Sequence, residues 1–194
     1  MEQKINPMDY KLFLDQLDEK LEKYRELHKD FICCKIGCSD CCEKGDYPLS
    51  AIELEYLMQG YINLDTEKKK LVQENIKNMK KGESCPFLIN NKCAVYPYRP
   101  IICRVHGLAY LCGGKCRDRG RGKYENKYGD KANKFERKVK VPHCTIEGKN
   151  YSKVYDGKEI FINPIKENLD TPNLLKDFDY GEIRNLYDWV KNQS

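Results

Sequence analysis

The first regular pattern along the chain is an apolar stripe near its N-terminus. Between residues 7 and 31, apolar or aromatic residues recur at alternating intervals of four and three, with charged residues at most other positions: Tyr10, Leu14, Leu17, Leu21, Tyr24, His28 and Phe31. This spacing places them on one face of an α-helix, and Pro7 suits its first turn. We therefore predict a helix over 7–31 whose apolar face packs on the core of the same chain.

Ser50 and Glu53 form the sequence signature of a second helix start. A serine followed three residues later by a glutamate lets each side chain bond the backbone N–H of the other residue. Gly60 is the residue type that commonly follows the end of a helix. The pattern predicts a helix over 51–59 that ends at Gly60.

The patterns of later segments predict two more helices and a β-hairpin. Apolar residues recur at helical spacing over 66–81 and again over 180–191. Residues 154–161 are typical of a β-hairpin with an Asp-Gly turn. Strands and helices do not alternate, which argues against Rossmann and TIM-barrel folds. The predicted fold class is mainly α: a small helical domain around an irregular, cysteine-rich centre, with a minor β-hairpin.

Composition indicates that this core needs additional stabilisation. Leu, Ile, Val and Phe make up only 44 of 194 residues, while 34% of residues are charged and 11 are cysteine. An odd number of cysteines disfavours a disulfide framework, and metal thiolate chemistry is the leading interpretation. We divide the chain into an N-terminal helix at 1–31 that packs on the core, a cysteine-cluster metal-binding domain at 32–150, and a C-terminal hairpin with helices at 151–194.

Charge is concentrated in one segment. The net charge is +5, yet residues 113–140 hold 11 Lys or Arg against 4 Asp or Glu and predict a basic loop. Such a loop could contact phosphates, but basic Gly-rich loops are usually solvated, so nucleic acid is not the expected partner. No apolar run reaches the length of a membrane span, and the first residues lack the apolar core of a signal peptide. We expect a cytoplasmic protein without a membrane partner.

Two groups of cysteines carry the candidate chemistry. The first spans Cys33 to Cys42 with Gly37 inside it, a spacing that lets a tight turn present several sulfurs to one ion. The second spans Cys85 to Cys103 and contains three prolines, which restrict the backbone. Because thiolates bring excess negative charge, a nearby guanidinium should help; we expect Arg99 or Arg104 to face the site as cofactor-binding residues, with Arg104 preferred.

The cysteine pattern resembles the YkgJ-type cysteine-cluster family, a zinc- or iron-chelating domain. The resemblance rests on Cys34-x3-Cys38-x2-Cys41-Cys42, on Cys85-Pro86-Phe87-Leu88, and on Cys93-x-Val95-Tyr96-x-x-Arg99-Pro100-x-x-Cys103-Arg104. It covers roughly residues 30–150. The resemblance implies a pool of eight metal ligands: Cys34, Cys38, Cys41, Cys42, Cys85, Cys93, Cys103 and Cys144.

Three functions follow from these features. The first is a metal-binding protein that chelates zinc or an iron–sulfur cluster, with a protein partner or substrate beyond the metal left open. The second is an iron–sulfur-dependent enzyme related to flagellin lysine-N-methylase, carrying out methyl transfer to a protein or small molecule, because that enzyme carries a similar cysteine cluster. The third is a nucleic-acid module built on the basic loop. The sequence does not decide between zinc and iron.

Overall fold

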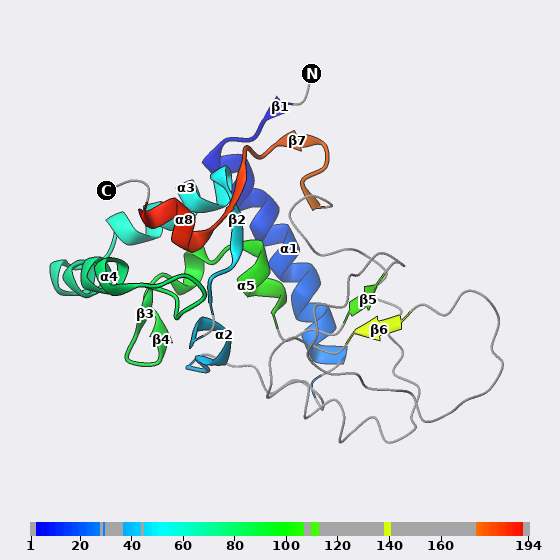
Figure 1. Cartoon of the computed structure of the whole chain (residues 1–194). Helices are drawn as coiled ribbons and strands as arrows, with labels where there is room; N and C mark the ends of the chain where they lie inside the picture. The colour runs from blue at the N-terminus through cyan, green and yellow to red at the C-terminus, as the bar shows by residue number, and fades with distance from the viewer. Residues whose placement is uncertain are drawn as a thin grey trace.

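The computed structural model describes residues 3–27, 29, 37–43, 45–106, 110–112, 138–140 and 174–191. Within these ranges the chain is mainly helical, with short two-stranded β-pairings around the helices (Figure 1), which confirms the predicted fold class. The predicted hairpin at 154–161 and most of the basic loop at 113–140 lie outside the described residues.

Helix α1, Pro7–Leu27, carries the predicted apolar stripe. Tyr10, Leu14, Leu17 and Leu21 are all buried and contact the same hydrophobic cluster as residues of α3, Ala51–Ile62, and α5, Ile101–Val105. The stripe therefore packs on the core of the same chain, as predicted. The helix predicted to reach residue 31 ends earlier, because α1 stops at Leu27 and Lys29 lies in a turn; residues 28, 30 and 31 are outside the described ranges.

Helix α3 begins as predicted and ends later than predicted. Ser50 donates its backbone N–H to Glu53 Oε2 at 2.9 Å, and Ser50 Oγ accepts from the Glu53 N–H at 3.4 Å, forming the expected capping box. The helix then continues through Gly60 to Ile62, so the predicted end at Gly60 was wrong. Gly60 lies against the ring of Tyr98, where a Cβ would stand 2.6 Å from Tyr98 Cγ. Close packing, and not chain termination, explains this glycine.

Helix α4, Thr66–Asn78, starts after Asp65, whose side chain accepts from the Lys68 N–H at 2.8 Å. It ends three residues before the predicted 81, because Met79 takes an extended backbone conformation. Helix α4 helps to enclose a second hydrophobic cluster, which is formed by Leu49, Leu54, Leu57, Val72, Met79, Phe87, Val95, Leu186 and Val190.

The C-terminal segment pairs with strands from the first quarter of the chain. Strand β1, Gln3–Lys4, pairs in parallel with β7, Phe178–Asp179, and β2, Pro48–Ser50, pairs antiparallel with β8, Ile183–Asn185. Only α8, Leu186–Lys191, is helical within the helix predicted at 180–191, because residues 183–185 complete the ladder with β2.

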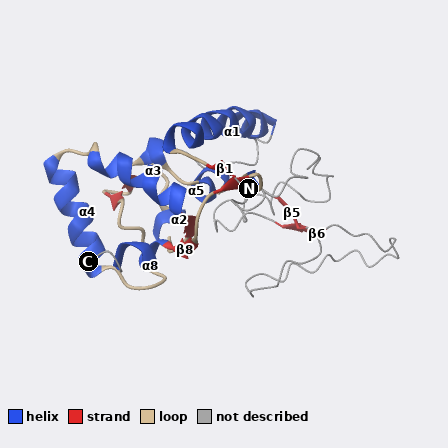
Figure 2. Ribbon diagram, turned by 90° about the horizontal axis from the view of Figure 1, so that it is seen from above, coloured by secondary structure: helices blue, strands red, loops and turns tan. Residues whose placement is uncertain are grey.

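The remaining elements are short. Strands β3, Leu88–Ile89, and β4, Lys92–Cys93, form a hairpin, and β5, Tyr110–Cys112, pairs with β6, Lys138–Lys140. Seen from above, α1 runs along one side of the molecule, while α4 and α8 lie together at its far end (Figure 2). Among the described helices, none combines the length and the apolar character that crossing a bilayer requires.

Candidate metal centre

Cysteines from both sequence groups line one cavity. Its volume is about 170 Å³, and its wall includes the six cysteines whose side chains the structure describes: Cys38, Cys41, Cys42, Cys85, Cys93 and Cys103. They come from different elements, namely the turn into α2 (Asp40–Glu43), α2 itself, the loop before β3, strand β4 and helix α5. Figure 1 shows α2 beside the β3–β4 hairpin and below α5. Segments more than 40 residues apart in sequence therefore converge on this cavity.

Backbone contacts hold the two groups together. The Cys85 N–H donates to the Cys42 carbonyl at 2.7 Å. Gly45 makes this approach possible, because a Cβ at that position would stand 3.0 Å from the Cys42 carbonyl oxygen and 3.2 Å from Cys85 Cβ. The Tyr47 hydroxyl donates to the Cys41 carbonyl at 3.0 Å, which fixes α2 from its other side.

The neighbouring cysteines Cys41 and Cys42 both face the cavity, with their sulfur atoms 3.9 Å apart. Adjacent residues do not easily point both side chains in one direction. On the short helix α2 both reach the same space. Two thiolates at this separation suit a single small cation, since sulfurs on a tetrahedral ion with bonds of ~2.3 Å lie roughly 3.8 Å apart.

The thiols are mostly held in their protonated form. Burial raises the pKa of Cys85 to about 12 and raises those of Cys93 and Cys103 as well, and nearby cysteines add to each effect. The hydrogen bond between the Cys41 and Cys42 side chains lowers the pKa of Cys41 to about 7, and the same bond together with burial raises the pKa of Cys42. A bound cation would compensate several thiolates at once, so this donor set fits a thiophilic metal.

Arg99 supplies positive charge to the same cavity. Its Nε donates to the Tyr96 carbonyl at 2.9 Å, and its guanidinium carbon lies 3.4 Å from the centre of the Tyr96 ring. The guanidinium lines the cavity, and its charge favours the thiolate forms of Cys41, Cys93 and Cys103, which partly offsets the larger rise that burial gives the pKa of Cys93 and Cys103. The hydrogen bond and the ring contact thus hold a cation beside the thiols.

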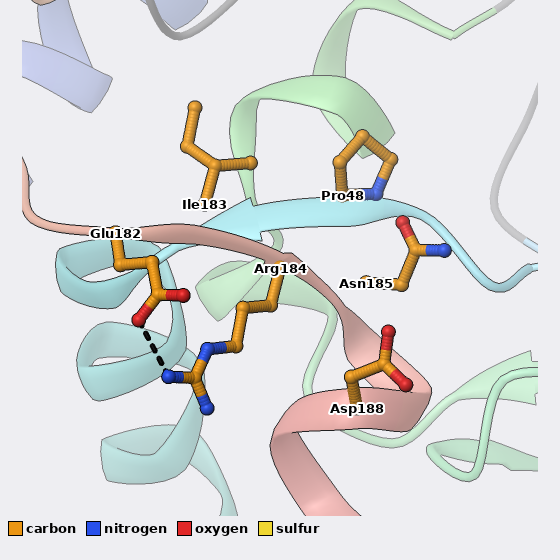
Figure 3. Close-up of a pocket in the computed structure, with 6 residues that line it drawn as sticks. All are labelled: Pro48, Glu182, Ile183, Arg184, Asn185 and Asp188. Atoms are coloured by element: carbon orange, nitrogen blue, oxygen red, sulfur yellow. Dashed lines mark hydrogen bonds and ion pairs between the residues drawn. The ribbon is translucent and has the colours of Figure 1, made fainter.

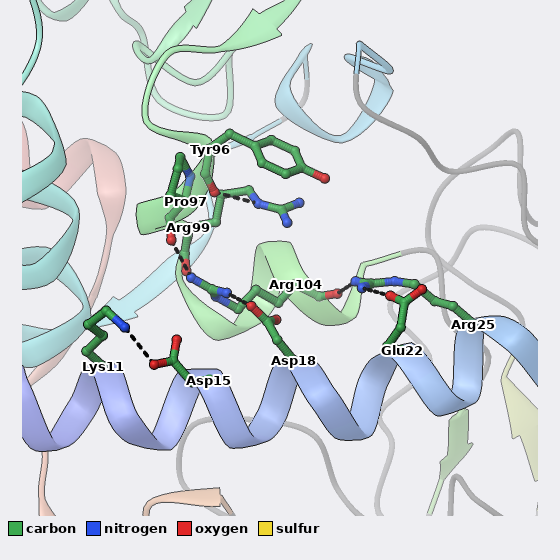
Figure 4. A network of polar contacts seen from close by, with 9 residues as sticks. All are labelled: Lys11, Asp15, Asp18, Glu22, Arg25, Tyr96, Pro97, Arg99 and Arg104. Carbon is green, nitrogen blue, oxygen red and sulfur yellow. Dashed lines mark hydrogen bonds and ion pairs between the residues drawn. The ribbon is translucent and has the colours of Figure 1, made fainter.

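Arg104, preferred from the sequence, is directed elsewhere. Its side chain is 5% exposed and pairs with Asp18 of α1, while Nε donates to the Arg99 carbonyl and Nη2 to the Pro97 carbonyl (Figure 4). Successive residues of a helix point about 100° apart. When Cys103 faces the cavity, Arg104 therefore faces α1.

The wall of the cysteine cavity also contains residues other than the cysteines and Arg99. Tyr47 and His106 stack edge to face with ring centres 5.7 Å apart, and both line the cavity together with Leu186 from the C-terminal segment. His106 lies three residues after Cys103 in the sequence, a spacing compatible with ligation of one metal ion. Tyr47 and Leu186 carried no signal, since their place depends on the pairing of β2 with β8.

The described cysteines line the same cavity but do not form a ready coordination site. Among the described residues, no three Cys, His, Asp or Glu side chains stand in an arrangement that would already hold a metal ion. The predicted ligands Cys34 and Cys144 lie outside the described ranges, as do Cys33 and Cys116. The structure thus brings together six of the eight predicted ligands around a shared cavity.

A second hollow of about 450 Å³ lies elsewhere, along β8, and contains no cysteine. Its lining side chains are drawn in Figure 3, where Arg184 Nη2 pairs with Glu182 at 2.6 Å. The hollow is open to solvent and its charged groups are exposed or half-exposed, so we assign the chemistry to the cysteine cavity.

Comparison with known families agrees with this assignment. Residues 33–144 match the CxxCxxCC family, described as "Putative zinc- or iron-chelating domain". The chain belongs to this family. The matched region contains both cysteine groups, and chelation of zinc or iron is the role that the description of the CxxCxxCC family gives. No curated protein and no solved structure matches the chain.

The first cysteine interval of this chain is one residue longer than the interval written in the name of the CxxCxxCC family. Cys34 and Cys38 are separated by three residues, where the family name has two. The last of the three, Gly37, has φ +94°, in the left-handed region that favours glycine, and it lines the cavity. A glycine turn therefore accompanies the longer interval.

Proposed function

We propose that this chain binds one metal centre through thiolates of both cysteine groups, and that the centre ties α2, the β3–β4 hairpin and α5 together. The convergence of Cys38, Cys41 and Cys42 with the second group on one cavity is the observation that supports this proposal. Cys34 and Cys144 complete the predicted ligand pool. Free thiols and a metal centre suit a reducing compartment, so the proposed location is the cytoplasm.

The residues around the cavity perform four tasks in this proposal. The cysteines supply soft donors, which select zinc or iron–sulfur clusters over hard cations. Arg99 offsets the negative charge that several thiolates leave. Leu49, Leu57 and Phe87 exclude water from the sulfurs. The bond between Cys85 and Cys42 keeps the two groups in register.

Zinc is the metal that we propose first. The sulfur separation of 3.9 Å between Cys41 and Cys42 is close to the roughly 3.8 Å expected for two sulfurs on one tetrahedral zinc ion. Structural zinc contributes free energy of folding outright, about 10–16 kcal/mol in small domains. A chain with few large apolar residues gains most from such a contribution.

The enzymatic alternative receives less support from the same geometry. Sites for small-molecule substrates usually enclose about 300–1,000 Å³, whereas the cysteine cavity measures about 170 Å³. This space suits an ion or a small cluster with its ligands. An iron–sulfur-dependent methyl transfer, as in flagellin lysine-N-methylase, would therefore require a substrate site outside this cavity.

Metal analysis of the protein purified without oxygen tests the proposal. We expect a colourless protein with stoichiometric zinc; a brown protein with broad absorbance near ~400 nm would assign an iron–sulfur cluster instead. Substitution of Cys42 or Cys103 by serine should each remove the metal. Cys116→Ser, outside the predicted ligand pool, is the matched control. Purified wild-type protein that contains neither metal, and takes up neither, would contradict the proposal.

A further inference from the structure

Arg104 is a buried cation with an unusually complete set of partners. Each of its three guanidinium nitrogens donates a hydrogen bond: Nε to the Arg99 carbonyl at 2.7 Å, Nη2 to the Pro97 carbonyl at 2.6 Å, and Nη1 to the Asp18 carboxylate. Its side chain is 5% exposed, and that of Asp18 is 41% exposed. A buried guanidinium depends on such pairing, because an unpaired buried charge is costly.

Two of these partners belong to the segment that forms part of the cavity wall. Pro97 lies in the short helix η1, Tyr96–Tyr98, and Arg99 follows it directly. Arg104 bonds back to both carbonyls from the adjoining helix α5, so it closes the turn between η1 and α5. Cys103 and Arg99 stand on the opposite side of this turn and face the cysteine cavity.

Helix α1 supplies the remaining partners. Asp18 binds the guanidinium, and Arg25 Nη2 donates to the Arg104 carbonyl at 3.0 Å while Nη1 pairs with Glu22 at 3.3 Å (Figure 4). Helix α1 lies outside residues 33–144, the range that matches the CxxCxxCC family. This chain therefore braces the family domain with an element that the domain match does not include.

We infer that Asp18 is a positioning residue of the metal centre: acting through Arg104, it holds the turn that presents Arg99 and Cys103 to the metal. The inference rests on the proposed function, because it assigns Asp18 an effect on metal retention. Without the Asp18 charge, Arg104 loses its counter-ion, the turn between η1 and α5 loosens, and a ligand of the centre moves more freely.

Asp18→Asn tests this inference in the full-length, metal-loaded protein. The amide keeps the size of the side chain and one oxygen acceptor, so the helix is retained while the charge is lost. Asp15→Asn is the matched control, because Asp15 lies one turn earlier on α1 in an exposed pair with Lys11. The measured quantity is the rate at which zinc passes to a chromogenic chelator, well below the melting transition of each variant.

We expect Asp18→Asn to release zinc about tenfold faster than wild type, the lower end of the effect of removing an outer-shell partner. Its far-ultraviolet circular dichroism should be unchanged, and cobalt substituted for zinc should give altered charge-transfer bands. Asp15→Asn should match wild type in each respect. A wild-type release rate and spectrum in Asp18→Asn would overturn the inference, as would an equal acceleration in both variants.

A double variant separates action through Arg104 from an independent effect. Arg104→Gln removes the charge that Asp18 neutralises and keeps a polar side chain. If Asp18 acts through Arg104, adding Asp18→Asn to Arg104→Gln should not accelerate release further. Multiplicative rates in the double variant would contradict this coupling. Wild-type protein that takes up no zinc or iron would instead contradict the proposed function, and the inference with it.

Discussion

The backbone N–H of Cys85 and the carbonyl of Cys42 form a 2.7 Å hydrogen bond that joins the two cysteine groups. The contact spans 43 positions of sequence and places the loop before β3 against the end of α2. Because both atoms belong to the backbone, the bond forms only if the segment around Cys85 can approach the end of α2 closely. Gly45 sets that distance, since its missing side chain leaves room for Cys85.

Gly45→Ala should therefore weaken metal binding. The added Cβ would stand 3.0 Å from the Cys42 carbonyl oxygen and 3.2 Å from Cys85 Cβ, so the two segments must move apart. We expect about tenfold weaker affinity, equivalent to about 1.4 kcal/mol, in a competition titration against a chelator. Glu43→Ala, an exposed change on α2, is the control. Equal affinity in Gly45→Ala and wild type would show that the approach of these segments does not govern the site.

Glu53→Ala should destabilise the fold, because one carboxylate caps two helices. Glu53 Oε2 accepts from the N–H and hydroxyl of Ser50 at the start of α3, and Oε1 accepts from the Ile101 N–H at the start of α5, at 3.0 Å. All of these groups are buried. Removing the acceptor leaves unsatisfied donors, and we expect a loss of about 3 kcal/mol in urea unfolding.

The exposed Glu55, on the same helix, provides the comparison for Glu53. Glu55→Ala should change the free energy of unfolding by less than about 0.5 kcal/mol. Similar losses in the two variants would contradict the dual-cap role. If Glu53→Ala loses its metal while it remains folded, α5, which carries Cys103, responds more strongly to the substitution than α3.

Gly60→Ala should destabilise the protein even though alanine is the better helix former. Helix propensity alone favours alanine by about 1 kcal/mol. The new Cβ would stand 2.6 Å from Tyr98 Cγ, and overpacking of this kind costs about 1–3 kcal/mol. We expect a lower melting temperature for Gly60→Ala, with Gln59→Ala close to wild type. A higher melting temperature would mean that the ring of Tyr98 moves aside without cost.

The outcomes at Ser50 and Gly60 show which parts of the fold the sequence could predict. The α1 stripe and the α3 capping box depend on residues within a few positions of one another, and both were predicted correctly. Gly60 was misinterpreted because its reason is Tyr98, which lies 38 positions later. Residues 183–185 were expected in a helix for a similar reason: their strand conformation depends on β2, which is distant in sequence.

For the candidate site as well, the sequence could predict some features and not others. Sequence spacing identified the cysteines as a group, since thiols in such density have few other uses. Their convergence on one cavity depends on tertiary contacts such as that between Cys85 and Cys42. Adjacency to Cys103 suggested that Arg104 would face the metal, but consecutive positions on a helix point in different directions. Arg99, four positions before Cys103, faces the cavity instead.

Arg99→Gln should make the metal centre more sensitive to chelators. The charge of the guanidinium favours the thiolate forms of Cys41, Cys93 and Cys103 against the opposing effect of burial on their pKa values, and the neutral amide cannot offset thiolate charge. We expect release to a chelator to accelerate by about tenfold, with Arg99→Lys intermediate.

Arg184→Gln is the matched control for Arg99. Arg184 also lies over an aromatic ring, 4.9 Å from the centre of Trp189, but it lines the cysteine-free hollow along β8. Its removal should leave metal release unchanged. Equal acceleration of metal release by the two substitutions would indicate general destabilisation. If neither substitution changes the release rate, Arg99 has no role at the metal centre.

X-ray absorption at the edge of the bound metal tests the central claim most directly, because it reports the ligand atoms around the metal. For the wild-type protein we predict a shell dominated by sulfur at ~2.3 Å, and for Cys103→Ser either fewer sulfur neighbours or loss of the metal. A shell of nitrogen and oxygen in the wild type would contradict a thiolate centre. A sulfur shell left unchanged by Cys103→Ser would contradict a centre shared between the two cysteine groups.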